Sequence, residues 1–230
     1  MINLKKDKGL QSLYQKMKGS VIDYGFNIDE LDLRVFTARV GANYPVEPGK
    51  GILFYGRATN GWDDDDKKND DLCLVYENNS SSPFFNLLYY LSWEFYGDSW
   101  CSKIAWSNIC KIAPNGGNPS DSLWRAQKNS LSAIIQREVE LLSPELIVLI
   151  TGNTVVHYSD PWHSPFFTAF PDLKEIRDIK WSESNGKDCT ATLYANGKIK
   201  VLLTDRPEFR PIEQHAAALK ELFEGDRVVD

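Results

Sequence analysis

The sequence predicts a three-layer α/β/α domain with a mostly parallel central sheet, and two observations lead to this prediction. Continuous apolar runs occupy residues 51–55, 104–110 and 146–150, and such runs are typical of strands that are covered on both faces of a parallel sheet. Between the runs lie longer segments whose apolar residues recur at helical spacing. Strands that alternate with helices along a chain indicate an α/β architecture.

In the first half of the chain, residues 10–18 predict a short amphipathic helix ahead of the core. The run at 51–55 is bounded by glycines and predicts a buried strand, and the Asn-, Gly- and Asp-rich residues 56–71 predict a loop. Residues 83–96 are aromatic and apolar at near-helical spacing. The run at 104–110 predicts a second strand, which ends before a proline and an Asn-Gly-Gly-Asn-Pro turn.

In the second half, an apolar stripe over residues 123–142 predicts a helix, for which Ser120 or Asp121 is a suitable N-cap. The sequence Leu-Ile-Val-Leu-Ile at 146–150 is the clearest strand of the chain. Residues 159–187 show no regular pattern, and we interpret them as an insertion.

The last part of the chain carries a hairpin signal, Asn-Gly at 196–197, between predicted strands at 190–195 and 198–204. A final helix is expected at 212–223, because its apolar residues fall on one face. We therefore predict that residues 1–230 form a single domain.

Composition limits the class of protein. Hydrophobic residues make up 42% and charged residues 25% of the 230 residues, which fits one globular domain rather than a disordered chain. The lysine-rich start is not followed by an apolar segment, so we expect a cytoplasmic protein without a signal peptide and without a membrane partner. The net charge of −6 counts against tight, sequence-independent binding to duplex DNA. The oligomeric state stays open.

The cysteines give no indication of a metal centre. Cys73, Cys101, Cys110 and Cys189 form no Cys-x-x-Cys pair, so neither zinc nor an iron–sulfur cluster is indicated, and we expect no metal and no other cofactor. A chain of this size needs no disulfide for stability, and scattered thiols are typical of proteins in a reducing cytosol.

The predicted sheet places the candidate site. In open α/β sheets, ligands bind beyond the carboxyl ends of the strands. Residues 56–62, 108–114, 151–154 and 204–210 follow the predicted strands. We therefore expect the functional residues in these four segments.

Three stretches of the chain resemble motifs of the uracil-DNA glycosylase superfamily. Residues 56–60, Gly-Arg-Ala-Thr-Asn after a strand, resemble its first motif. The Pro-Phe pair at 83–84 resembles the segment whose aromatic ring stacks on the flipped base. Residues 107–111, Ser-Asn-Ile-Cys-Lys, resemble the strand whose Asn reads the edge of uracil.

Two further segments continue this resemblance in the same order along the chain. Residues 143–152 resemble the helix-to-strand segment of the superfamily, and Asp-Arg-Pro-Glu at 205–208 lies where the superfamily has its His-Pro-Ser motif. The resemblance extends over residues 51–223 and implies the uracil-DNA glycosylase-like fold. It also implies hydrolysis of the N-glycosidic bond of a flipped pyrimidine-type base.

The resemblance implies a role for each candidate residue. The substrate-binding residues would be Gly56, Arg57, Trp62, Phe84 and Asn108, with the last two holding the base. The catalytic residues would be Asn60 or Asp63, which position water, and Arg206, which stabilises negative charge on the departing base together with Arg57 or holds a phosphate.

Three features depart from the superfamily pattern. Arg57 stands where many members carry the carboxylate or amide that activates water, and Arg206 replaces the histidine. The chain also lacks the four spaced cysteines of the members that hold an iron–sulfur cluster. These departures put the usual activity in question and leave the predicted fold unchanged.

Each candidate also has a purely structural alternative. Phe84 can pack in the core, Asn108 can fix the loop after its strand, and the two arginines can form surface ion pairs. Asn60 can be an ordinary turn residue. The four aspartates at 63–66 repel one another, so we expect a solvated loop there with Asp63 alone as a candidate base.

The histidines are weaker candidates. His157 and His163 flank Asp160 in an irregular segment and do not indicate a metal site, and His215 is expected to be packed or exposed on the last helix.

Three hypotheses about function follow. The first is a glycosylase-like hydrolase, and the second is a module that binds a base, a nucleotide or a nucleic-acid end without cleaving it. DNA or a nucleobase or nucleotide ligand is therefore the expected partner. The third, a dinucleotide-binding Rossmann domain, is disfavoured because no Gly-x-Gly-x-x-Gly follows the first strand.

Overall fold

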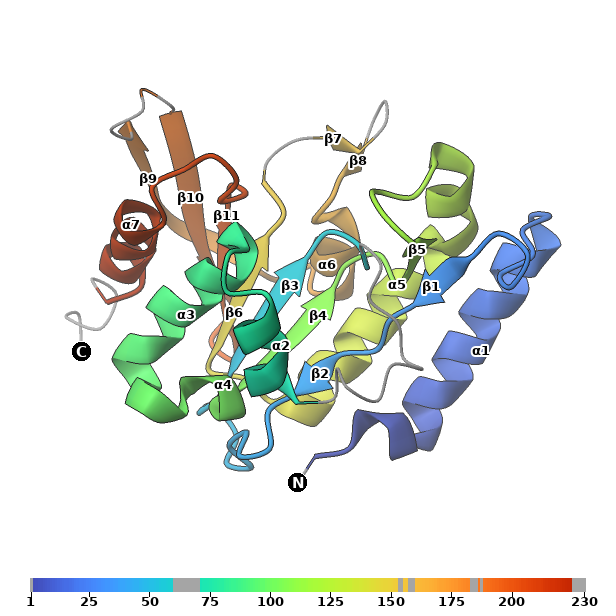
Figure 1. Ribbon diagram of the computed structural model, residues 1–230, viewed down its shortest axis with the longest axis horizontal. Coiled ribbons are helices and arrows are strands. Elements are labelled where there is room, and N and C mark those ends of the chain that lie inside the picture. The colour runs from blue at the N-terminus through green and yellow to red at the C-terminus, as the bar shows by residue number, and fades with distance from the viewer. Residues whose placement is uncertain are drawn as a thin grey trace.

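The computed structural model of the chain describes residues 2–59, 71–152, 155–156, 160–182, 186 and 188–224. These residues form a mixed seven-stranded sheet with helices packed on both of its faces (Figure 1). Within them, every helix is too short or too polar to cross a lipid bilayer. The α/β class that the sequence predicts is thus confirmed.

The sheet is parallel in its centre and antiparallel at both sides. Its strands are, in chain order, Arg39–Val40 (β2), Ile52–Gly56 (β3), Ile104–Asn108 (β4), Leu146–Ile150 (β6), Lys174–Ser182 (β9), Asp188–Ala195 (β10) and Lys200–Thr204 (β11). In space the order is β2-β4-β3-β6-β11-β10-β9.

The three strands predicted from apolar runs, β3, β4 and β6, and the second arm of the predicted hairpin, β11, are neighbours in one sheet with parallel pairing. The expectation of a mostly parallel sheet is nevertheless wrong for the sheet as a whole. The outer pairs β2–β4, β11–β10 and β10–β9 are antiparallel, so parallel and antiparallel pairs are equally frequent. The reason is that short turns, including the predicted Asn-Gly hairpin, connect the last three strands, and short turns allow only antiparallel pairing.

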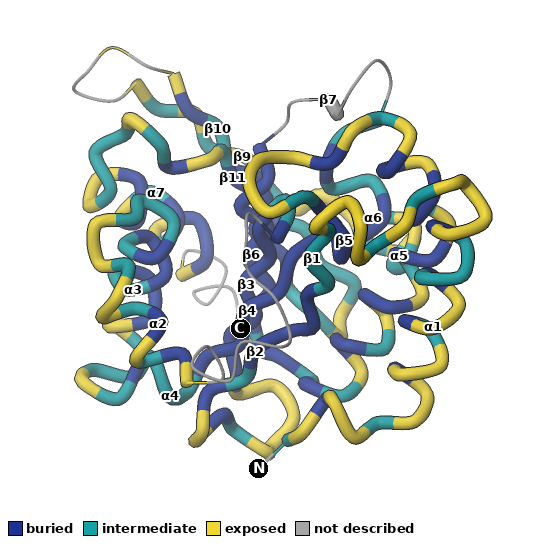
Figure 2. The backbone as a smooth tube through the Cα atoms, turned by 45° about the vertical axis from the view of Figure 1, so that its right-hand side comes forward, coloured by how far each residue is buried: buried dark blue, intermediate teal, exposed yellow. Residues whose placement is uncertain are grey.

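Helices cover the two faces of the sheet and form two hydrophobic layers. One face carries Lys8–Asp23 (α1), Asp121–Leu142 (α5) and Ser164–Ala169 (α6). The other face carries Leu72–Asn78 (α2), Pro83–Tyr96 (α3), Trp100–Lys103 (α4) and Ile212–Glu224 (α7). Figure 2 shows the buried backbone of β3, β4 and β6 between these two layers.

Short elements complete the fold. They are the 3₁₀ turns Leu4–Lys6 (η1) and Gly97–Ser99 (η3), and the strands Leu33–Val35 (β1), Ile112–Pro114 (β5), Val155–Val156 (β7) and Asp160–Pro161 (β8). Strand β1 pairs with β5 and strand β7 with β8, both antiparallel. The side chain of Ser120 accepts a hydrogen bond from the amide of Leu123, so of the two proposed N-caps of α5 it is Ser120 that caps the helix.

The segment 159–187, which the sequence presents as irregular, contains regular structure. Helix α6 packs on the sheet through the buried Phe166, and β9 forms the edge strand next to β10. Strand β9 is mostly exposed and charged, so it lacks the apolar continuity by which the central strands are found. Whether the segment is an insertion relative to a family stays a prediction.

Two cysteines are joined, against the expectation of four thiols. Cys73 in α2 and Cys101 in α4 form a disulfide, whereas Cys110 and Cys189 are buried thiols. Disulfides are rare in cytosolic proteins, so this bond does not favour the cytoplasmic location, which stays a prediction.

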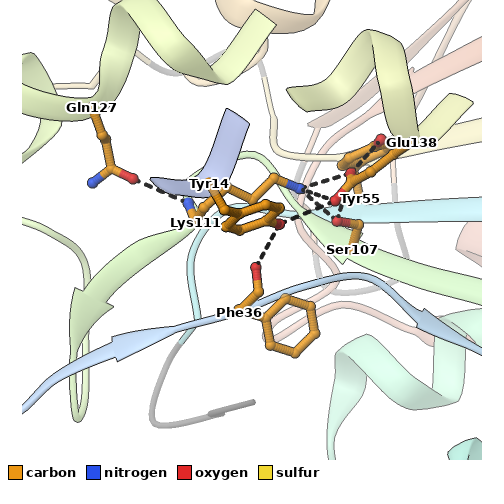
Figure 3. Close-up of polar contacts among 7 residues, drawn as sticks. All are labelled: Tyr14, Phe36, Tyr55, Ser107, Lys111, Gln127 and Glu138. Atoms are coloured by element: carbon orange, nitrogen blue, oxygen red, sulfur yellow. Dashed lines mark hydrogen bonds and ion pairs between the residues drawn. The ribbon is translucent and has the colours of Figure 1, made fainter. Parts of the chain in front are cut away.

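A buried ion pair lies beneath β3 and β4, on the face that α1 and α5 cover (Figure 3). The ammonium group of Lys111 donates to both carboxylate oxygens of Glu138, each at 2.8 Å, and to the hydroxyl of Ser107 at 2.7 Å. Neither side chain of the pair is exposed to solvent. Lys111 follows β4 and Glu138 lies on α5, so the pair joins a strand end to the covering helix.

Two tyrosine hydroxyls complete the hydrogen bonding of the Glu138 carboxylate. The hydroxyl of Tyr55 on β3 donates to the carboxylate at 2.9 Å. The hydroxyl of Tyr14 on α1 lies 3.3 Å from the other carboxylate oxygen and donates to the carbonyl of Phe36 at 2.9 Å. Burial and the negative charge of Glu138 raise the pKa of Tyr55 well above its usual value, so its hydroxyl stays a protonated donor.

We predict that Glu138→Ala destabilises the protein by ~3–5 kcal/mol, because it leaves the Lys111 ammonium buried without its counter-ion. Urea unfolding measures this change. The matched control is Glu140→Ala on the same helix, where an exposed carboxylate pairs with Arg137 at the surface, and we expect little change there. Equal stability of the two variants would show that the buried pair is not needed.

Candidate functional site

A pocket lies beyond the carboxyl ends of the central strands, the ends of β3 and β4 that point to the top of Figure 1. Its volume is about 260 Å³, just below the ~300–1,000 Å³ of most small-molecule sites. The lining residues come from the ends of β3, β4, β6 and β11, from the start of α3 and from the turn before α5: Gly56, Arg57, Ala58, Thr59, Ser82, Phe84, Phe85, Trp106, Asn108, Gly117, Asn118, Ile150, Arg206, Pro207 and Glu208.

The structure brings five of the eight candidate residues together. Gly56, Arg57, Phe84, Asn108 and Arg206 all line this one pocket. Four of them lie at or after the ends of strands in the sheet, where ligand sites are expected, whereas Phe84 lies in the first turn of α3. The part that each would play in binding or catalysis stays a prediction.

The other three candidates, Asn60, Trp62 and Asp63, lie outside the described residues. The same holds for His157 and for the rest of the aspartate run at 64–66.

Gly56 and Asn108 form the inner corner of the pocket. They are directly paired across β3 and β4. A Cβ atom on residue 56 would lie only 2.5 Å from the side-chain oxygen of Asn108 and 3.4 Å from the ring of Phe84. Glycine is therefore the residue that leaves room for the amide and the ring at this corner.

The amide of Asn108 is buried and incompletely bonded. Only 2% of Asn108 is exposed, and among the described residues its Nδ2 has no hydrogen-bond partner. A buried donor without a partner costs ~1–3 kcal/mol. An amide in this state at the wall of a pocket can donate a hydrogen bond to an ordered water or to a ligand.

Phe84 lies between the aromatic core and the pocket. Proline at position 83 starts α3, and Phe84 follows in its first turn. The ring is half-buried, with its centroid 5.4 Å from that of Phe85 and 5.9 Å from that of Trp106. It packs on these core aromatics and also borders the pocket beside Gly56.

Arg57 is held in place at the pocket wall. Its Nε donates to the carbonyl of Thr151 at 2.7 Å, and its guanidinium lies 5.6 Å from the ring centroid of Trp162. Burial and, to a smaller extent, the nearby charge of Arg206 lower the pKa of Arg57 to about 10. Arg57 is therefore still a cation at neutral pH.

Arg206 reaches the pocket from the turn after β11. It forms an ion pair with Glu208, and its side chain is 42% exposed. The neighbouring Asp205 accepts a hydrogen bond from the amide of Thr190 and lies 3.7 Å from Arg210. The surface ion pair considered as an alternative for Arg206 thus exists, but it forms at the rim of the pocket.

Sequence reasoning missed three polar or aromatic residues of the pocket. Glu208 has one carboxylate oxygen that is buried without a described partner, and the hydroxyl of the fully buried Thr59 is in the same state. Trp106 lies two residues before Asn108 on β4, and residues two apart face the same side of a strand. This spacing was the sequence signal that could have identified Trp106 as a pocket residue, whereas Glu208 has no such signal in the neighbouring sequence.

The described histidines are not part of this pocket. His215 is fully buried and shares a hydrogen bond of 2.7 Å with the hydroxyl of Thr204, while burial and then Arg210 lower its pKa to about 4. Burial also lowers the pKa of His163. In the described parts of the chain, no three His, Cys, Asp or Glu side chains are grouped so that they could hold a metal ion.

Comparison with known proteins adds no assignment, because no protein-family model and no curated protein matches the chain. The function is therefore argued from the pocket itself.

We predict that Gly56→Ala destabilises the protein by ~1–3 kcal/mol, because the added methyl group overpacks the corner formed by Asn108 and Phe84. Thermal unfolding measures the loss, and the NMR signals of the Asn108 side-chain amide report its displacement. The control is Gly19→Ala in α1, where a Cβ atom meets nothing within 4 Å and alanine favours the helix. A Gly56→Ala variant as stable as this control would contradict the tight corner.

Proposed function

We propose that the chain is a divergent uracil-DNA glycosylase-like protein whose pocket binds a pyrimidine-type base. The observation that carries the proposal is the buried amide of Asn108, a residue that lines the pocket and whose Nδ2 lacks a partner among the described residues. A pyrimidine edge presents acceptors and donors side by side, and an Asn amide offers the complementary pair.

Two neighbours of Asn108 suit a flat, uncharged ring. Phe84 provides an aromatic surface on which a base can stack, a contact worth ~1–3 kcal/mol per base. Gly56 lacks the side chain that would fill the space between them. The pocket volume of about 260 Å³ is small for a ligand site, which favours a single base or nucleotide over a larger ligand.

We predict that Asn108→Ala weakens binding of the pyrimidine nucleoside deoxyuridine at least about tenfold, because a hydrogen bond of ~0.5–1.5 kcal/mol is lost together with the shape of the corner. Isothermal titration calorimetry measures the affinity. The control is Asn129→Ala, which changes an exposed Asn on α5 outside the pocket. If wild type and Asn108→Ala bind deoxyuridine equally, the pocket does not read a base through this residue.

Hydrolysis of an N-glycosidic bond is the second candidate function, and the pairing of Arg206 with Glu208 favours it. In this reaction water attacks the sugar carbon, the carbon–nitrogen bond breaks, and the base leaves as an anion. A cation such as Arg206 would stabilise the departing anion, and the carboxylate of Glu208, which also lines the pocket, would accept the proton of the water.

We predict little or no excision of uracil from duplex DNA. Losing one preorganised donor costs ~10²–10³ in rate, and here an arginine stands where the superfamily has a histidine. The net charge of −6 also opposes binding to a long duplex.

An excision assay on uracil-containing single- and double-stranded oligonucleotides measures this, with Asn108→Ala and Glu208→Gln beside the wild type. Turnover that both variants abolish would establish the hydrolase instead of the binding module.

A further inference from the structure

The charges around the pocket differ in sign from the protein as a whole. Among its described lining residues, Arg57 and Arg206 carry positive charge and Glu208 alone carries negative charge. The described lining of the pocket therefore has an excess of one positive charge in a chain whose net charge is −6. A local cationic site on an acidic protein selects anionic ligands.

The two guanidinium groups reach the pocket from different strand ends. Arg57 follows β3, and Arg206 follows β11 beyond the intervening β6. Their charges repel each other, and this repulsion is one of the causes that lower the pKa of Arg57. Burial is the larger cause of the lowered pKa, and the charges of Glu208 and Asp205 act in the opposite direction. An anion bound between the two groups would remove the repulsion.

From this arrangement we infer that the ligand is a pyrimidine nucleotide whose phosphate group lies between Arg57 and Arg206. The inference rests on the base-binding pocket proposed above. Arg57 directly follows Gly56, so the cation stands one residue from the corner that would hold the base. Guanidinium groups suit phosphate because their planar donors pair with two of its oxygens.

A single phosphate fits the charge balance better than a polynucleotide does. Proteins that bind long nucleic acids neutralise many phosphates with Lys and Arg, whereas the described lining of this pocket contains two arginines and no lysine. The shared chemistry, a base with one nearby phosphate, is found both in a free nucleotide and in a nucleotide within a strand.

Isothermal titration calorimetry with three probes tests the inference: deoxyuridine, deoxyuridine 5′-monophosphate and a short single-stranded oligonucleotide that contains deoxyuridine. We expect the monophosphate to bind at least about tenfold more tightly than the nucleoside, with an advantage that decreases as the salt concentration rises. Arg57→Gln and Arg206→Gln should each bring the ratio of these two affinities close to one. The control Arg125→Gln changes an exposed arginine of α5 outside the pocket and should retain the wild-type ratio.

The outcomes distinguish a failure of the phosphate site from a failure of the proposed base-binding function. Equal affinities of the wild type for nucleoside and monophosphate would overturn the phosphate site and leave base binding intact. No binding of any probe would overturn the proposed function itself. A preference for phosphate that both arginine variants remove supports the inference. The oligonucleotide then shows the source of the phosphate. Tighter binding of the oligonucleotide than of the monophosphate indicates a nucleotide within a strand, and otherwise the ligand is a free nucleotide.

Discussion

The buried ion pair between Lys111 and Glu138 is the constraint on which the site end of the sheet depends. Two charges removed from water are costly, and only complete hydrogen bonding offsets that cost. Here Ser107 on β4 and Tyr55 on β3 supply the additional contacts. Each of these two residues directly precedes a residue of the pocket corner, Asn108 or Gly56. Because successive side chains of a strand face opposite sides, the network holds both strand ends from one face of the sheet, and the corner positions 56 and 108 point to the other face.

The two groups of buried polar residues differ in how well they are satisfied. Around Glu138, both carboxylate oxygens have partners of 3.0 Å or less. In the pocket, Asn108, Thr59 and Glu208 each retain a buried polar atom without a partner among the described residues. A saturated network stabilises the fold, whereas unsatisfied groups along one cavity wall indicate what a ligand would complete.

Several features of this structure have no local signal in the sequence. Lys111 and Glu138 are charged residues, which are almost never fully buried unless paired, and the pairing depends on how α5 lies on the sheet. Cys73 and Cys101 are 28 residues apart and show no spacing motif, so only the packing of α2 beside α4 brings them together. Strand β9 is an exposed edge whose pairing partner, and not its composition, makes it a strand.

The sequence by itself determined the central strands and the edge of the sheet at which the candidate site lies. Apolar continuity, helical spacing and turn residues are local properties, so they can be read along the chain, and strand ends then locate the site. The tertiary structure alone decided that Arg57 and Arg206 share one pocket with Glu208, and that Nδ2 of Asn108 has no partner among the described residues. The proximity of these residues depends on the strand order β4-β3-β6-β11. Strand order is set by packing between distant segments, and no short stretch of sequence encodes it.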